Sequence, residues 1–297
     1  MTRHFLDISS LCDRSIDRLL QRALALADGA PPARLSGSVG NLFLEPSTRT
    51  RVSFEMAARA VGLDVINIEQ DRSSATKGES LIDTARTLVA MGIGVLVIRH
   101  PETGIAARLA AELPDKVAVI NAGDGTGEHP SQALLDAATL LRSGLDFSTA
   151  RMAMVGDLRH SRVARSGLAL FDRLGTRELR IAGPKALLPE QVPARVRICR
   201  SLTEAVTDAD VIMMLRIQKE RIDRELWPES SDYHAEWGLR PEHLTLAAAD
   251  CRVMHPGPIN RGVEIADSVA DGDQSLILDQ VRMGVAARTA LFEWVLG

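Results

Sequence analysis

The sequence predicts an α/β fold made of two doubly wound parallel-sheet domains joined by helices. Short apolar runs of strand length alternate with longer amphipathic runs along most of the chain, which is the order expected when crossover helices link parallel strands. Several of the short runs, such as Gly94–Ile98, are continuously apolar, as in strands buried on both faces. A chain of 297 residues is long enough for two domains of ordinary size.

The first half of the chain carries four strand-like runs. A helix over Ser15–Ala27, with Ser15 as its cap, is expected to precede them. Strands are expected over Val39–Leu44, Asp64–Ile68, Gly94–Ile98 and Val117–Ile120, and helices over Glu79–Met91, Ile105–Glu112 and Ser131–Arg142. A further helix follows the first strand, with Val52, Met56 and Ala60 as its apolar face. The glycine-rich segment Asn121–Pro130 is typical of a loop.

A domain boundary is expected near Ser143-Gly144, where the last of these helices ends. The predicted domains are 1–135 and 136–281, and a terminal helix, 282–297, is expected to pack back on the first domain. Strands of the second domain are expected over Arg151–Val155, Glu178–Ile181, Arg195–Cys199, Val211–Leu215 and Arg252–Met254, with helices over Val163–Leu174 and Gln274–Leu296.

Composition excludes several classes of protein. Hydrophobic residues make up 45% and charged residues 25% of the chain, which indicates a soluble globular protein. A net charge of −4 argues against a nucleic-acid partner. No apolar run reaches the roughly 20 residues of a membrane span, and the N-terminus lacks the apolar core of a signal peptide. Three scattered cysteines (Cys12, Cys199 and Cys251) fit a reducing compartment, so a cytoplasmic protein is expected.

Familiar cofactor and nucleophile motifs are missing from the sequence. It contains no G-x-G-x-x-G, no P-loop, no H-E-x-x-H and no G-x-S-x-G segment. The sequence therefore predicts no cofactor and no metal.

The most informative stretch is Ser47-Thr48-Arg49-Thr50-Arg51, which follows an apolar strand and opens a helix. Serine and threonine suit a helix N-terminus, where free N–H donors and a partial positive charge favour a phosphate. Two guanidinium groups in the same turn could grip that phosphate with planar forks. Taken alone, an ordinary helix cap with two surface arginines explains the stretch equally well.

Polar residues gather where the predicted strands end. In open parallel sheets, ligands bind beyond the carboxyl ends of the strands. The segments at such ends are Glu45–Thr50, Arg99-His100, His129, Asp157–Arg162, Arg216–Gln218 and His255–Pro258.

Three segments of the first half resemble the carbamoyltransferase family, in that family's order: Ser47–Arg51, Ile98–Pro101 and the H-P-x-Q segment at 129–132. The resemblance implies a carbamoyltransferase-like fold and a site for carbamoyl phosphate. The binding residues it implies are Ser47, Thr48, Arg49, Thr50, Ser73, Arg99, His129, Gln132, Gly257 and Pro258. The catalytic residues it implies are Arg49, Thr50, Lys77, Arg99 and His129.

The second half is similar to the branch of the family that uses L-aspartate. The segments VGDLRHSRVAR (155–165) and LRIQKER (215–221) resemble its aspartate-binding segments. The ornithine branch is expected to carry a cysteine after the histidine of its last motif, whereas here Pro256 follows His255. The resemblance implies that Lys77, Arg162, Arg216 and Gln218 bind aspartate, and that the product, N-carbamoyl-L-aspartate, enters pyrimidine (UMP) synthesis.

The resemblance also implies a homotrimer with shared active sites, in which Ser73 and Lys77 reach a neighbouring subunit's site. It implies that Glu45 pairs with Arg162 and Arg221 when the domains close. Dihydroorotase or regulatory chains are possible further partners. Two other functions stay open: an ornithine-type carbamoyltransferase, and a non-catalytic scaffold for a partner enzyme.

Overall fold

The computed structural model describes residues 3–69, 79–217 and 230–297. The chain divides into two compact units, one formed by Met1–Ala138 with Val281–Gly297 and the other by Thr139–Gln280. Every strand pair in both sheets is parallel. The predicted α/β architecture with two parallel sheets is confirmed.

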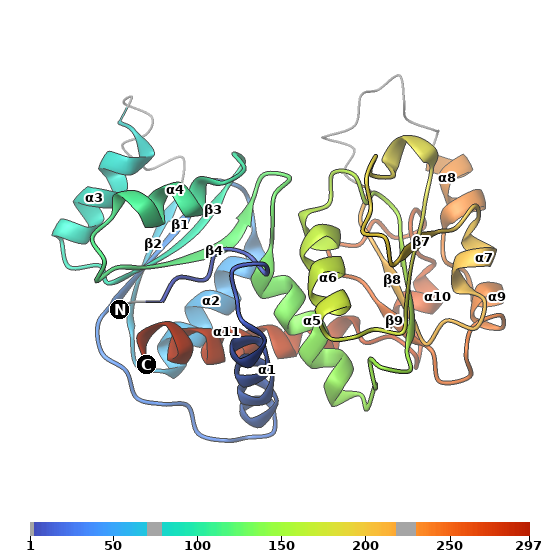
Figure 1. Ribbon diagram of the computed structural model, residues 1–297, viewed down its shortest axis with the longest axis horizontal. Helices are drawn as coiled ribbons and strands as arrows, with labels where there is room; N and C mark the ends of the chain where they lie inside the picture. Colours follow the sequence, from blue (N-terminus) through green and yellow to red (C-terminus); the bar gives the residue numbers. More distant parts are fainter. Residues whose placement is uncertain (1–2, 70–78, 218–229) are drawn as a thin grey trace. The chain divides into compact units, whose positions relative to one another are not determined.

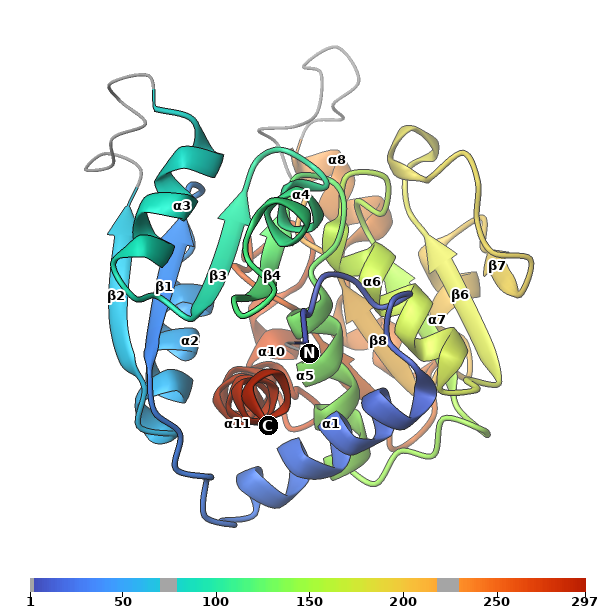
Figure 2. The same ribbon diagram turned by 60° about the vertical axis from the view of Figure 1, so that its left-hand side comes forward.

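The first unit contains a four-stranded sheet in the order β2-β1-β3-β4 (Figure 2). Its strands are β1 (Ser38–Phe43), β2 (Asp64–Glu69), β3 (Val95–His100) and β4 (Ala118–Asp124). Helices α3 (Leu81–Ala90) and α4 (Ile105–Glu112) lie on one face, and α2 (Thr48–Ala60) lies on the other (Figure 1). Helix α1 spans Asp13–Ala27. Helices α5 (Pro130–Arg142) and α11 (Ile277–Leu296) contain the two points where the chain passes between units.

Strands β1, β3 and β4 are largely buried on both faces, whereas Asp64, Ile66 and Asn67 of the edge strand β2 are exposed. On one face, Leu42 and Leu96 pack with Leu109 of α4 in a continuous hydrophobic cluster. On the other face, Phe54 of α2 meets Phe292 of α11 edge-to-face, with ring centroids 6.0 Å apart. Residues 281–297 therefore belong to the core of the first unit, although they end the chain.

Helix α2 shows one expectation to be wrong. Val52 and Met56 are 43% and 53% exposed, whereas Phe54, Ala57 and Ala58 are fully buried. Val52, Met56 and Ala60, which are spaced four residues apart, therefore lie on the solvent-exposed face of this helix. Its inward face combines one large aromatic ring with small residues, which lets the helix approach β1 and β2 closely.

Three predicted boundaries are also wrong. Helix α1 starts at Asp13 with Cys12 in the N-cap position, so Ser15 is not its cap. Strand β4 continues through Asn121–Asp124, which were expected in a loop. Helix α11 begins at Ile277 rather than Gln274. The other expected strands and helices are present, with ends shifted by a residue or two.

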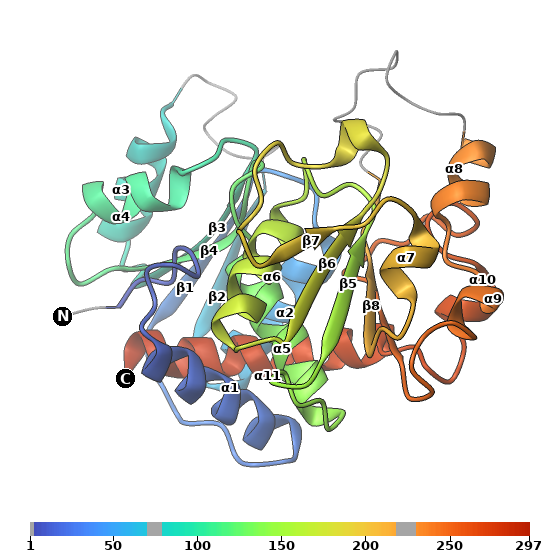
Figure 3. The same cartoon turned by 45° about the vertical axis from the view of Figure 1, so that its right-hand side comes forward.

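The second unit contains a five-stranded sheet in the order β7-β6-β5-β8-β9 (Figure 3). Its strands are β5 (Arg151–Val155), β6 (Glu178–Ala182), β7 (Val196–Ile198), β8 (Val211–Met214) and β9 (Arg252–Met254). Its helices are α6 (Arg162–Arg173), the 3₁₀ turn η3 (Lys185–Leu187), α7 (Leu202–Val206), α8 (Ser230–Trp237), α9 (Pro241–Leu244) and α10 (Asp267–Ala270). A hydrophobic cluster joins Val155 and Ile212 of the sheet to Tyr233 and Trp237 of α8.

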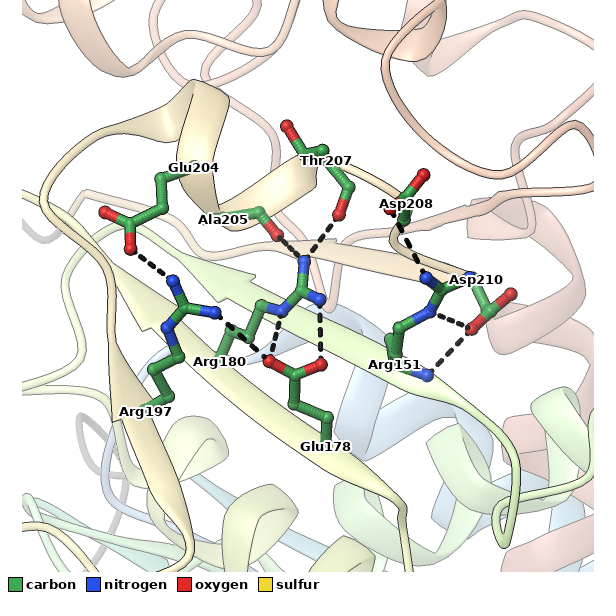
Figure 4. A network of polar contacts seen from close by, with 9 residues as sticks. All are labelled: Arg151, Glu178, Arg180, Arg197, Glu204, Ala205, Thr207, Asp208 and Asp210. Atoms are coloured by element: carbon green, nitrogen blue, oxygen red, sulfur yellow. Dashed lines mark hydrogen bonds and ion pairs between the residues drawn. The ribbon is translucent and has the colours of Figure 1, made fainter.

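A network of ion pairs ties the amino-terminal ends of these strands together (Figure 4). The Arg180 side chain is only 7% exposed and forms an ion pair with Glu178 at 2.8 Å. Its guanidinium also donates to the carbonyl oxygens of Ala205 and Thr207. The hydrogen bond from Arg180 is the main cause that lowers the pKa of Glu178. Further pairs join Arg151 to Asp208 and Asp210, and Arg197 to Glu178 and Glu204.

Cys12, Cys199 and Cys251 are all free thiols. Among the described helices, none has both the length and the apolar character needed to cross a membrane.

Candidate active site

The polar residues of the first unit lie where the order of its strands reverses. From β1 the chain passes to β2 on one side and then to β3 on the other. Such a reversal opens a crevice at the carboxyl ends of the two central strands, which is where α/β proteins bind ligands. The register pairs Phe43, the last residue of β1, with Arg99 of β3. Arg99 therefore lies at the same edge as the segment Glu45–Thr50.

Helix α2 begins at this edge. Ser47 occupies its N-cap position, but the Ser47 side chain makes no capping hydrogen bond. The Ser53 hydroxyl donates to the carbonyls of Arg49 and Thr50 at 2.8 and 3.0 Å and so braces the first turn. Thr48 and Arg49 are exposed, while Thr50 is buried. Since the first turn carries no acidic residue, its amides and the nearby arginine form an electropositive end suited to an anion.

Arg99 is held in place by its neighbours. Its side chain is 13% exposed, and its Nε lies 3.4 Å from Oε2 of Glu45. Its Nη1 also donates to the carbonyl of Ala122 at 3.3 Å. A guanidinium held in this way can meet a ligand with little further loss of side-chain entropy. Beside it, burial lowers the pKa of His100.

Asp124 organises the segment that leads to His129. Its carboxylate accepts hydrogen bonds from the backbone amides of Glu128 and Gly104, both at 2.7 Å. Gly125 has a φ of +46°, and its amide donates to the carbonyl of His100 at 2.8 Å. Asp124 was not among the residues predicted from the sequence. An aspartate followed by glycine is, however, a recognised turn signal.

His129 and Gln132 are both buried at the start of α5, with exposures of 4% and 8%. The backbone N–H of Gln132 donates to the backbone carbonyl of His129 at 2.9 Å, which fixes the spacing of the two residues. The Gln132 side chain donates from Nε2 to Oδ1 of Asp136, also at 2.9 Å.

The second unit repeats the arrangement at its own point of reversal, between β5 and β8. Arg162 is the first residue of α6 and is 7% exposed. Ser161 caps this helix by accepting a hydrogen bond from the amide of Ala164 at 3.1 Å. Arg216 lies two residues beyond the end of β8 and is partly buried. The sheet therefore carries two arginines at the carboxyl ends of its two central strands.

The turn after β9 is built around His255. The Gly257 amide donates to Nδ1 of His255 at 2.8 Å, and Nε2 of His255 lies 3.1 Å from Oε1 of Glu264. Because Nδ1 accepts, the proton must be on Nε2, which donates to the carboxylate. Glu264 also accepts from the amide of Asn260 at 2.7 Å. This buried pair shapes the turn that contains the cis peptide Gly257-Pro258. Glu264 was not among the residues predicted from the sequence.

The structure thus brings Ser47, Thr48, Arg49, Thr50, Arg99, His129 and Gln132 to one edge of the first sheet, and Arg162, Arg216, Gly257 and Pro258 to one edge of the second. Ser73, Lys77, Gln218 and Arg221 lie outside the described residues. Within the described ranges, no group of three or more His, Cys, Asp or Glu residues is placed to hold a metal. The first edge can bind a phosphate and polarise a carbonyl group, and the second can bind carboxylates.

Two family models match the chain and together cover most of it. Residues 3–142 match the aspartate/ornithine carbamoyltransferase carbamoyl-P binding domain, and residues 148–295 match the Asp/Orn binding domain of the same family. This chain belongs to the aspartate/ornithine carbamoyltransferase family.

Curated relatives of this carbamoyltransferase extend over nearly its whole length. The aspartate carbamoyltransferase catalytic subunit of Stenotrophomonas maltophilia (strain K279a) is 45% identical over 309 residues, which cover 99% of this chain and 96% of the relative. The corresponding subunit of Xanthomonas campestris pv. campestris (strain B100) is 46% identical over 303 residues, with the same coverage.

Solved structures share the fold of this carbamoyltransferase. Aspartate transcarbamoylase from Trypanosoma cruzi, in complex with carbamoyl aspartate and phosphate, aligns with a TM-score of 0.87 at 29% identity, covering 100% of this chain and 97% of that one. Ornithine carbamoyltransferase from Pyrococcus furiosus aligns with the same TM-score and coverage at 25% identity. The fold is therefore common to enzymes that act on either amino acid, and the side chains must decide between them.

Proposed function

We propose that this carbamoyltransferase transfers the carbamoyl group of carbamoyl phosphate to the α-amine of L-aspartate, giving N-carbamoyl-L-aspartate and phosphate. The observation that carries the proposal is the pair of arginines, Arg162 and Arg216, at the point of reversal of the second sheet. Aspartate presents two carboxylates, and two separate guanidinium forks match them. The names of the curated relatives support the same substrate.

Carbamoyl phosphate is assigned mainly to the first unit. Ser47, Thr48, Arg49 and Thr50 would hold its phosphate with the first amides of α2. Arg99, His129 and Thr50 would donate to the carbamoyl oxygen. The side-chain oxygen of Gln132 and the backbone carbonyls around Gly257 and Pro258 would accept hydrogen bonds from the carbamoyl NH2 group. Ser73 would donate a further hydrogen bond to the phosphate.

Aspartate is assigned to Arg162, Arg216 and Gln218, with Lys77 contacting both substrates. Gln218, Lys77 and Ser73 lie outside the described residues, so their assignment depends on the family resemblance alone.

The reaction needs no covalent enzyme intermediate. The neutral amine attacks the carbamoyl carbon, and a tetrahedral intermediate forms with negative charge on the former carbonyl oxygen. The carbon–oxygen bond to phosphate then breaks, and the leaving phosphate accepts the proton lost by the amine. Each well-placed donor to such an oxyanion is worth about 3–4 kcal/mol. Holding the two substrates together supplies about 7–11 kcal/mol more.

A transferase for ornithine is the second candidate, since the fold of the Pyrococcus furiosus enzyme is equally similar. Ornithine keeps the α-carboxylate but replaces the side-chain carboxylate of aspartate with an ammonium group, which the arginine assigned to that carboxylate would repel. The Pro256 that follows His255 also departs from the ornithine pattern. A non-catalytic scaffold is the third candidate.

We further propose that the active enzyme is a cytoplasmic homotrimer of pyrimidine synthesis, with Ser73 and Lys77 acting in a neighbour's site. The name carried by the relatives supports the pathway, and three free thiols fit a reducing compartment. Dihydroorotase or regulatory chains remain candidate partners of this trimer.

The test of the reaction is an assay of phosphate release with L-aspartate and L-ornithine in parallel. We expect activity with aspartate only, lost in Arg49→Ala and retained in Arg59→Ala. Arg59 is a matched control because it lies on the same helix, is 70% exposed and pairs with Glu55. Activity with ornithine would overturn the assignment of Arg162 and Arg216, and inactivity of the folded protein with both amines would favour the scaffold.

Shared sites have a separate test. Arg49→Ala and Lys77→Ala, each inactive alone, should regain activity when mixed and reassembled, because some sites in mixed trimers would then carry neither substitution. Failure to regain activity in trimers shown to be mixed would refute sharing.

A further inference from the structure

A buried polar chain lies behind Gln132 in the first unit. Gln132 donates from Nε2 to Oδ1 of Asp136 at 2.9 Å, one helical turn further along α5. Asp136 is fully buried. It interacts electrostatically with Arg288 of α11, which is 3% exposed. The Arg288 guanidinium in turn lies over the ring of Phe54 on α2, with Cζ 5.0 Å from the ring centroid.

Asp136 determines which way the Gln132 amide faces. An ionised carboxylate can only accept hydrogen bonds, so it must face the NH2 group of Gln132 and not its carbonyl. The Gln132 carbonyl oxygen is then directed away from Asp136. Reversing the amide would place a carbonyl oxygen against a carboxylate in a buried setting, where unfavourable contacts are costly.

Arg288 supplies a positive charge near Asp136, which favours an ionised carboxylate there. Burial lowers the pKa of Arg288 to about 10, with the nearby Asp136 acting in the opposite direction, so Arg288 remains cationic near neutral pH. Its Nη1 donates to the carbonyl of Gly284 at 3.1 Å, one turn earlier on α11. A buried carboxylate beside a buried guanidinium is stabilised in its charged form.

We propose that Asp136 is a positioning residue for carbamoyl recognition: it holds the Gln132 amide with its carbonyl oxygen turned toward the ligand, so that the site selects an NH2 group. The proposal rests on the proposed function, because it takes Gln132 to accept from the carbamoyl NH2. Asp136 itself would touch no substrate.

This role predicts a specific pattern among three anions. Acetyl phosphate has a methyl group where carbamoyl phosphate has NH2, and inorganic phosphate has neither. Only carbamoyl phosphate gains from a correctly oriented Gln132. A change at Asp136 that frees the amide should therefore weaken the binding of carbamoyl phosphate and leave the other two anions unchanged.

The experiment measures the binding of carbamoyl phosphate, acetyl phosphate and inorganic phosphate to the full-length enzyme and to Asp136→Asn by calorimetry. Asparagine both donates and accepts, so it tolerates either orientation of Gln132. We expect the preference for carbamoyl over acetyl phosphate to fall about tenfold, the loss of about one hydrogen bond. In a Gln132→Met background, the same substitution at Asp136 should not change the preference further.

Each alternative gives a different result. An equal loss of affinity for all three anions would show a merely structural role and overturn the proposal, as would an unchanged preference. If the wild-type enzyme bound no carbamoyl phosphate, the proposed function itself would fail. If only the role of Asp136 were refuted, the wild-type enzyme would still bind carbamoyl phosphate and turn it over.

A measurement on the wild-type protein covers the case in which Asp136→Asn does not fold. The side-chain NH2 protons of Gln132, labelled with ¹⁵N and assigned by their absence in Gln132→Met, should exchange with water far more slowly than those of the exposed Gln191. Equal exchange rates for the two glutamines would refute the hydrogen bond to Asp136 in solution and with it the proposal.

Discussion

Replacing Gly125 with alanine tests how the loop that carries His129 is held. Gly125 has a φ of +46°, in the left-handed region. A Cβ atom at this position would lie 2.5 Å from Oγ1 of Thr103 and 2.6 Å from the carbonyl oxygen of Pro101. Both the backbone conformation and the space therefore oppose any side chain.

The two penalties can be estimated separately. A left-handed conformation costs a residue with a Cβ about 1–2 kcal/mol. Forcing an extra carbon into a packed site costs about 1–3 kcal/mol. We therefore expect Gly125→Ala to lower the free energy of unfolding by about 2–5 kcal/mol. Because Asp124 and Gly125 set the path to His129, we also expect weaker binding of carbamoyl phosphate.

Two other glycines serve as controls in urea unfolding. Gly29 has a φ of +96° but open space around it, so Gly29→Ala should cost only the backbone term. Gly94 has open space and no unusual φ, so Gly94→Ala should cost least. The expected order of destabilisation is Gly125, then Gly29, then Gly94. If Gly125→Ala cost no more than Gly29→Ala, the close contact with Pro101 and Thr103 would not exist in solution.

Three further predictions concern stability and are measured by urea unfolding. Arg180→Met should cost about 2–4 kcal/mol at pH 7, because it removes charged hydrogen bonds from a buried site. The hydrogen bond from Arg180 is the main cause that lowers the pKa of Glu178 in the folded protein. The stabilisation from this pair is therefore fully present above the pKa of Glu178 in the unfolded chain, and it is lost as the pH falls through the lower pKa of the folded protein. The gap between wild type and Arg180→Met should thus narrow below about pH 4, and a constant gap would contradict the pairing. Phe292→Ala should cost about 3–5 kcal/mol, because this ring is fully buried; a cost under about 1 kcal/mol would mean that α11 is not packed in solution as described. His255→Leu should cost about 2–4 kcal/mol, because it leaves the buried Glu264 carboxylate without one of its donors, and an unchanged midpoint would refute that hydrogen bond.

The order of strands and helices was predictable because most strands contain a short apolar run, such as Val95–Ile98, and turn residues separate these runs from the amphipathic helices. The position of the polar segments was predictable for a related reason. Parallel strands point the same way, so residues that follow different strands share an edge. In sequence, Arg99 lies 49 residues after Thr50 and 54 after Glu45, yet the register places Arg99 opposite Phe43, at the same edge of the sheet.

Other features depend on contacts that no local pattern contains. The buried face of α2 consists of Phe54 and of small residues that fit against the sheet. The spacing of the apolar residues in the sequence therefore predicted the wrong face of this helix to be buried. Strand β4 extends through Asp124 because its backbone continues to pair with β3, with Asn121 opposite Ile98 and Asp124 opposite His100. Asp136 was missed because its importance comes from Gln132 and from a helix at the other end of the chain.

The network at the amino-terminal ends of the second sheet has a consequence for how this enzyme can change over time. The residues proposed to bind ligands lie at one edge of the sheet, the reactive edge, while Arg180, Glu178 and their neighbours secure the opposite edge (Figure 4). Substitutions that strengthen the secured edge can accumulate without touching a ligand. The stability gained there can then offset strained or destabilising changes at the reactive edge, so that new substrate preferences become accessible to a protein that still folds.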